Sequence, residues 1–280
     1  MPRSGDPSGS DREPFATLRE GSCFLRVAPA YRAVAESLGL LETGGLAALL
    51  SRGGGPTGRA PSVIVELPEC RERLLVRPVQ HGGWLAPLWG ESILGPGRPS
   101  RELDVTHCLR HRGAPVPRPV FAAAQRLAGP FHRAAVATVF EEGTQDALQF
   151  LRATPTPARI LRACTAAGRA IRRFHDAGGR HRDLHAGNLL LREGAEATEC
   201  TVIDLDRASA GRLVTPRARA SELGRLLRSV LKPGVRPRTG RTGAAEFIDA
   251  YTEGDAKLLE GLAACWPRER RRLVLRGLSP

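Results

Sequence analysis

Three oxygen-bearing side chains in the middle of the chain have the types and spacing that phosphoryl transfer requires. Asp183 and Asn188 stand five residues apart in the segment HRDLHAGNLLL, and Asp204 follows in the segment VIDLD. Phosphoryl transfer needs a carboxylate that accepts or orients the proton of the attacking hydroxyl. It also needs a carboxamide and a second carboxylate that hold Mg²⁺ on the nucleotide phosphates. These residues therefore predict a magnesium-dependent phosphotransfer site.

The residues between Asn188 and Asp204 predict the turn that brings the two together. Residues 188–191 (NLLL) and 200–206 (CTVIDLD) are apolar runs joined by a polar segment, which is typical of a β-hairpin. Such a hairpin returns the chain so that Asp204 faces Asn188. Any one of these residues alone is more often a turn or cap residue. The whole set in this order favours the catalytic interpretation.

The second half of the chain has mostly helical patterns. Thr156 and Pro157 are the expected N-cap and first residue of a helix, and apolar residues then recur at helical spacing as far as Gly178. Ser221 is the expected cap of a further helix over ELGRLLRSVL, and helical patterns continue from there. These helices predict a large lobe that carries the catalytic loop.

The first half reads as strands with one helix. A hairpin is predicted over residues 62–67 and 73–79, and two further strands over 118–127 and 131–140. Leu103, Val105, Cys108 and Leu109 give a helical pattern within residues 101–113.

These patterns predict an α+β fold of two lobes. The expected divisions are a disordered leader over residues 1–14, a small strand-rich N-lobe over 15–142 and a larger, mostly helical C-lobe over 143–280. We find no internal repeat.

The composition narrows the classes of partner. The chain of 280 residues carries 42 Lys and Arg against 29 Asp and Glu, a net charge of +13. A basic surface attracts nucleic acid, anionic lipid or phosphorylated substrates. Aromatic residues make up only 5% of the chain, which argues against a nucleic-acid-reading surface. We see no signal peptide and no apolar stretch of membrane-spanning length, so we expect a cytoplasmic protein.

The motifs resemble those of the protein-kinase-like superfamily, in which HRDxxxxN and DFG appear here as residues 181–188 and 204–206. More closely, the chain is similar to the lipopolysaccharide-core sugar kinases, in particular those that phosphorylate 3-deoxy-D-manno-octulosonic acid (Kdo). The shared segments are HRDLHAGNLLL, VIDLDRA, LLVRPVQHGG (74–83) and GAPVPRPV, and the resemblance covers about residues 45–230. It implies a two-lobed kinase-like fold, ATP and Mg²⁺ as cofactors, and phosphorylation of Kdo at O-4.

The resemblance also implies a role for each site residue. Asp183 is the implied catalytic base, and Asn188 and Asp204 are the implied Mg²⁺ ligands. Arg77 stands where typical kinases place the lysine that pairs with the nucleotide phosphates, and Glu102 is its expected ion-pair partner. A solvated arginine at a strand edge is an equally good interpretation of Arg77.

The loop that covers the phosphates is expected over GGGPTGRAPS, with Gly58 as a nucleotide contact, although this segment does not match GxGxxG.

The implied acceptor is Kdo on a lipid A precursor at the cytoplasmic face of the inner membrane. The net charge of +13 suits a peripheral, salt-sensitive association with that anionic surface. The arginine-rich run over residues 267–277 is a candidate contact, and an ordinary solvated helix face is the alternative.

Two other functions stay open: a kinase for another small molecule or for protein, and a non-catalytic pseudokinase. The imperfect glycine loop and the missing strand lysine favour the pseudokinase, whereas the intact Asp183, Asn188 and Asp204 set favours an enzyme. The sequence gives no oligomeric state.

Overall fold

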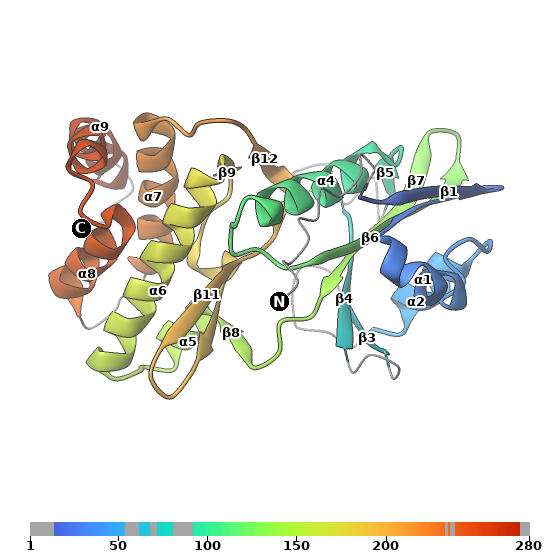
Figure 1. The fold of residues 1–280 in the computed structure, drawn as a ribbon, viewed down its shortest axis with the longest axis horizontal. Helices are drawn as coiled ribbons and strands as arrows, with labels where there is room; N and C mark the ends of the chain where they lie inside the picture. The colour runs from blue at the N-terminus through green and yellow to red at the C-terminus, as the bar shows by residue number, and fades with distance from the viewer. Residues whose placement is uncertain are drawn as a thin grey trace, which may run out of the picture. The chain divides into compact units, whose positions relative to one another are not determined.

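The structure is a computed structural model that describes residues 14–53, 62–67, 72–80, 92–232, 235 and 239–274 (Figure 1). Its internal contacts divide the chain into two units, which we call the N-unit and the C-unit. The N-unit comprises Met1–Leu103 and Pro119–Val139, and the C-unit comprises Asp104–Arg118 and Phe140–Pro280. Gly58 lies outside the described residues.

The N-unit is built on one antiparallel sheet with the strand order β1-β2-β6-β7-β4-β3, in which β5 pairs with β7. The predicted hairpin β3/β4 is confirmed, and so is the hairpin β6/β7. The strands are β1 (Ala16–Glu20), β2 (Cys23–Val27), β3 (Val63–Leu67), β4 (Glu72–Pro78), β5 (Ser92–Leu94), β6 (Pro119–Ala128) and β7 (Phe131–Val139).

Apolar residues on both faces of this sheet are buried. One face packs against the short helices α1 (Arg32–Ser37) and α2 (Gly45–Ser51), through residues such as Leu46 and Leu49. The other face packs against Leu103 in the middle of the long helix α4 (Gly97–His111). Central strands that are covered on both faces read as continuous apolar runs, which is why β6 was recognisable in the sequence.

The expectation of a single helix in the first half was wrong. Helices α1 and α2 have six and seven residues, too few to show a helical period clearly. Helix α2 starts in a tight turn, where a Cβ on Gly45 would lie 1.9 Å from the carbonyl oxygen of Gly39. Helix α4 also begins four residues before the predicted segment.

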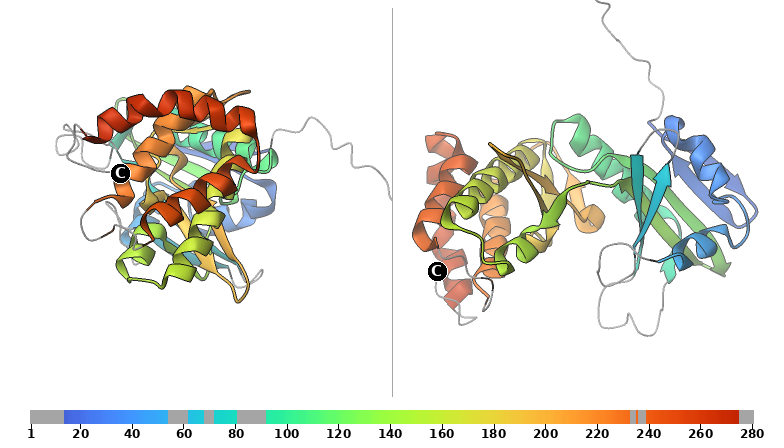
Figure 2. Two further views of the ribbon diagram at one scale, coloured as in Figure 1. Left: turned by 90° about the vertical axis from the view of Figure 1, so that its left-hand side faces the viewer. Right: turned by 90° about the horizontal axis from the view of Figure 1, so that it is seen from below.

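Besides the end of α4, the described part of the C-unit has five further helices and two small sheets, and its long helices pack mainly on one another (Figure 2). Its sheets have the orders β11-β10-β8 and β12-β9. The helices are α5 (Ala147–Arg152), α6 (Pro157–Asp176), α7 (Pro216–Val230), α8 (Gly240–Thr252) and α9 (Ala256–Val274). The strands are β8 (Thr144–Asp146), β9 (Gly179–His181), β10 (Leu189–Glu193), β11 (Thr198–Val202) and β12 (Ala208–Ala210).

Helix α6 is the centre of the C-unit. Its residues Ile160, Ile171 and Phe174 are buried in the core of the C-unit, and the helix packs chiefly against β11 and α8. The predicted helix is therefore confirmed, with Thr156 at the N-cap position, although its side chain makes no capping bond.

The predicted start of helix α7 was wrong. The helix begins at Pro216, and the hydroxyl of Thr215 accepts a hydrogen bond from the backbone N–H of Ala218 at 3.3 Å. Ser221 lies inside the helix, one turn after its start. Thr215 followed by proline carries the same N-cap and N1 signal as the start of α6.

No helix in the described ranges combines the length and the apolar character that a membrane crossing needs.

Candidate active site

The loop between β9 and β10 holds Asp183 and Asn188. The 3-10 helix η2 (Ala186–Asn188) closes this loop, and the backbone N–H of Ala186 donates to the hydroxyl of Ser229 on α7 at 2.9 Å. Asn188 is 5% exposed, and its Nδ2 donates to the backbone carbonyl of Asp183 at 2.9 Å. Asp183 itself is exposed. The loop thus fixes a buried amide directly behind an accessible carboxylate.

The β10/β11 hairpin brings Asp204 back to this loop, as the sequence predicted. Leu189 pairs with Val202, and one residue further on the backbone N–H of Ile203 donates to the carbonyl of Asn188 at 3.0 Å. Asp204 then adopts a left-handed conformation with φ 61° and ψ 64°. A non-glycine residue in this region is strained, and such strain is commonly found at functional sites.

His181 links the two segments. Its Nε2 donates to the backbone carbonyl of Ile203 at 3.0 Å, and its Nδ1 accepts the backbone N–H of Asp183 at 3.3 Å. One nitrogen donates and the other accepts, so the ring is neutral. Burial lowers the pKa of His181, which keeps this tautomer in place. His181 therefore positions Asp183 and the segment before Asp204 at the same time.

A buried polar network supports the loop from beneath. Glu222 on α7 is 2% exposed, and its Oε2 accepts the backbone N–H of His181 at 2.8 Å. The same oxygen accepts from Nε2 of His175 at 3.3 Å, and Nδ1 of His175 lies 2.7 Å from the Tyr251 hydroxyl. That hydroxyl also accepts from Arg219 at 3.2 Å.

Burial in this network shifts the pKa values of His175 and Tyr251. Burial lowers the pKa of His175 and raises the pKa of Tyr251 to about 12. His175 is therefore neutral, and the Tyr251 hydroxyl keeps its proton and can donate to it. The sequence patterns did not predict this network. The only signal was a glutamate within the apolar pattern ELGRLL.

The residues of the loop fit a magnesium ion in their donor chemistry. A carbonyl oxygen only accepts hydrogen bonds, so Asn188 must direct its Nδ2 to Asp183 and is left with Oδ1 as a free oxygen donor. Asp204 is exposed and supplies carboxylate oxygens. No group of three or more His, Cys, Asp or Glu in the described chain is arranged to hold a metal by itself. A site of one amide and one carboxylate suits Mg²⁺, which usually takes its remaining ligands from water and phosphate.

The N-unit contains the other two predicted residues. The Nη2 of Arg77 on β4 donates to Oε1 of Glu102 on α4, and the two form an ion pair. The Glu102 side chain is 6% exposed and that of Arg77 is 31% exposed, so the carboxylate fixes a guanidinium that solvent still reaches. The pairing is present as the sequence suggested. The contact with a nucleotide remains a prediction for Arg77, for Glu102 and for Gly58.

Comparison with known proteins places these observations in a family. A sequence model of the lipopolysaccharide kinase (Kdo/WaaP) family matches residues 75–251.

Three curated proteins named 3-deoxy-D-manno-octulosonic acid kinase also align with the chain. The protein of Mannheimia succiniciproducens is 33% identical over 174 residues, which are 59% of this chain and 70% of that protein. That of Haemophilus influenzae is 32% identical over 154 residues, 52% of this chain and 62% of that protein. That of Xylella fastidiosa is 33% identical over 162 residues, 56% of this chain and 61% of that protein. In the last two alignments the chain spans less than two thirds of the relative.

The fold has a counterpart among solved structures. A structure described as WaaP in complex with acyl carrier protein superposes with a TM-score of 0.55 and 20% identity, covering 91% of this chain and 99% of that chain. The two-lobed kinase-like α+β fold expected from the sequence is confirmed.

Proposed function

Because the chain belongs to the lipopolysaccharide kinase (Kdo/WaaP) family, we propose that it transfers the γ-phosphoryl group of ATP to the 4-hydroxyl of Kdo on a lipid A precursor. The observation that carries this proposal is the arrangement of Asp183, Asn188 and Asp204 in one hydrogen-bonded unit. The curated relatives named Kdo kinase support the acceptor.

Asp183 is the group we assign to the acceptor. Its exposed carboxylate can accept the proton of the sugar hydroxyl as the oxygen attacks the γ-phosphorus. The new bond joins the sugar oxygen to phosphorus, and the bond that breaks joins this phosphorus to the bridging oxygen of ADP. His181 and Asn188 hold the Asp183 backbone from two sides, through its N–H and its carbonyl.

Asn188 Oδ1 and the Asp204 carboxylate are the groups we assign to Mg²⁺, which when bound neutralises phosphate charge. Buried Asn188 cannot rotate its amide without losing the bond to Asp183, so its oxygen direction is fixed before the nucleotide arrives. Fixed donors need less reorganisation during the reaction.

Arg77 is the group we assign to the nucleotide phosphates in the N-unit, with Glu102 as the residue that orients it. A guanidinium offers a planar pair of donors that matches two phosphate oxygens, whereas lysine acts as a point charge. The Arg77 side chain is 31% exposed, so a phosphate can reach it from solvent.

We further propose that the protein works at the cytoplasmic face of the inner membrane as a peripheral protein. The net charge of +13 is the supporting observation, because each basic residue near an anionic leaflet contributes about 1 kcal/mol.

The test is transfer of label from [γ-³²P]ATP, with Mg²⁺, to a Kdo–lipid A acceptor, run beside free sugars and a protein panel. We expect label on the Kdo lipid alone, and its loss in Asp183→Ala and Asp204→Ala. Asp249→Ala, which removes an exposed carboxylate from α8, is the matched control and should retain activity.

The other functions give different results in the same assay. Label on another acceptor keeps the kinase chemistry and rejects Kdo. No transfer to any acceptor by a folded protein supports a pseudokinase.

A further inference from the structure

A cavity of about 330 Å³ in the C-unit is lined by four arginines from three different elements. Arg180 comes from β9, Arg217 from the first turn of α7, and Arg268 and Arg272 from α9. Glu269 is the one acidic residue in the lining, and it is 4% exposed. The lining thus carries four positive charges and one negative charge, which is the composition of an anion-binding site.

The ion pairs of these four arginines show which guanidinium groups have a carboxylate partner. Arg272 donates to Glu269 at 2.7 Å, and Arg180 lies 3.5 Å from Glu222. Arg217 and Arg268 have no ion-pair partner in the part of the chain that the structure describes. Two guanidinium charges are therefore uncompensated. Both side chains are exposed, so water screens their mutual repulsion, and a dianion that pairs with both gains two charge-assisted contacts.

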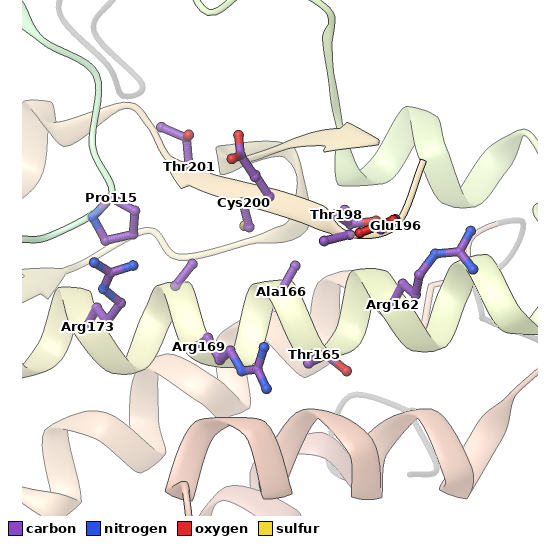
Figure 3. Close-up of a pocket in the computed structure, with 13 residues that line it drawn as sticks. Pro115, Arg162, Thr165, Ala166, Arg169, Arg173, Glu196, Thr198, Cys200 and Thr201 are labelled. Atoms are coloured by element: carbon purple, nitrogen blue, oxygen red, sulfur yellow. The ribbon is translucent and has the colours of Figure 1, made fainter. Parts of the chain in front are cut away.

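A second cavity in the C-unit has a different balance of charge. It has a volume of about 500 Å³ between α6 and β11, and it is lined by Arg162, Arg169 and Arg173 but also by Glu196 and Glu199. Figure 3 shows its arginines spaced along α6, with Arg162 and Glu196 at one end and Arg173 beside Pro115 at the other. These charges are spread out and partly balanced, so this cavity makes a useful control.

The arginine cavity is also close to the catalytic loop. Asp183 is the third residue after Arg180, and a fully extended chain of three residues spans at most about 11 Å. Glu222 contacts both the Arg180 guanidinium and the backbone of His181, so the cavity wall and the catalytic loop share a support. An anion in this cavity can thus belong to a substrate whose hydroxyl lies at Asp183.

We propose that this cavity binds a phosphate group of the lipid acceptor, at a distance from the hydroxyl that is phosphorylated. The proposal rests on the proposed function for the identity of the acceptor. A phosphomonoester fits better than a carboxylate, because it carries close to two negative charges and three acceptor oxygens. The cavity would then select acceptors that already carry phosphate on the lipid portion.

The test compares Arg217→Gln/Arg268→Gln with Arg169→Gln/Arg173→Gln, which removes the same charge from α6. On phosphorylated Kdo–lipid A we expect the first variant to raise KM for the acceptor about tenfold or more, with kcat and the KM for ATP unchanged. The α6 variant should change KM less than twofold. On a chemically dephosphorylated Kdo lipid, wild type and the first variant should have equal KM values.

Three kinetic outcomes overturn the proposal. They are an unchanged KM in Arg217→Gln/Arg268→Gln, an equal loss in the α6 variant, and a loss that persists on the dephosphorylated lipid.

A binding measurement without ATP separates this proposal from the proposed function. Flotation with phosphatidylcholine vesicles that contain Kdo–lipid A should show binding by wild type and weak binding by Arg217→Gln/Arg268→Gln, whether or not transfer occurs. Equal, Arg217-dependent binding to phosphatidylglycerol vesicles would assign the cavity to membrane headgroups. Complete displacement by millimolar inorganic phosphate would assign it to free phosphate. Either result rejects the acceptor phosphate.

Discussion

His181 donates from Nε2 to the backbone carbonyl of Ile203 at 3.0 Å, and this bond joins the segment before Asp204 to the loop that carries Asp183. The two segments are twenty-two residues apart in sequence. The same imidazole accepts the backbone N–H of Asp183 at 3.3 Å. One neutral ring therefore sets the positions of the implied base and of the implied metal ligand together.

We predict that His181→Phe lowers kcat about tenfold or more and lowers the free energy of unfolding by about 1–3 kcal/mol. Phenylalanine fills a similar space, but it leaves the Ile203 carbonyl without its donor in a mostly buried site. Urea melts and steady-state kinetics measure the two effects. A kcat equal to wild type would show that Asp183 and Asp204 are positioned without this ring.

We predict that Asn188→Asp lowers stability as well as activity, whereas Asp204→Asn lowers activity alone. A buried carboxylate at position 188 cannot donate to the Asp183 carbonyl and faces an acceptor instead, at a cost of about 1–3 kcal/mol. Asparagine tolerates the left-handed backbone of position 204, so the fold is kept there. Both variants should need more Mg²⁺ for half-maximal rate. Equal thermal midpoints for the two variants would contradict the role of the Asn188 amide.

We predict that Arg77→Met raises the KM for ATP about tenfold and destabilises the N-unit by about 1–2 kcal/mol. The loss of stability arises because Glu102 is left buried without its cation, and partial exposure of Arg77 limits its size. In Arg77→Met/Glu102→Gln the stability should return while the KM stays high. Arg126→Met, at an exposed position of β6, is the matched control. A normal KM for ATP in Arg77→Met would leave Arg77 with a structural role only.

The spacing of Asp183, Asn188 and Asp204 was readable in the sequence because one hairpin and one short loop bring them together. Helix α6 was readable for a similar reason, since its apolar period extends over five turns. Local signals of this kind are strong when an element is long and regular.

Other features depend on contacts that no local pattern reveals. Glu222 and His181 are hydrogen-bonded although they are 41 residues apart in sequence, and His175 and Tyr251 are hydrogen-bonded although they are 76 residues apart. Helices α1 and α2 are too short to show a period. Helix α7 begins after Thr215, whereas the sequence pattern favoured Ser221 as its cap.

We predict that stability falls as the pH drops below 6.5 because His175 and His181 are buried as neutral rings. Burial lowers the pKa of His107, His175 and His181 below the ordinary value of 6.5. Below pH 6.5 the unfolded chain therefore binds protons that the folded chain does not. For buried His175 and His181 the stabilising contribution is complete above pH 6.5 and is lost as the pH falls, with a slope of at most about 1.4 kcal/mol per pH unit for each ring. His107 is only partly buried, so solvent screening makes its contribution smaller.

Urea melts of wild type and His175→Gln at pH 7, 6 and 5 check this dependence. Glutamine removes one titrating group from the buried network, so the slope of stability against pH should be smaller in the variant. Arginine partners lower the pKa of Asp176 and of Glu193. These two carboxylates therefore lose their contribution to the free energy of unfolding only below about pH 4.5. A slope in His175→Gln that equals the wild-type slope would show that the His175 ring gains a proton as easily in the folded protein as in the unfolded chain.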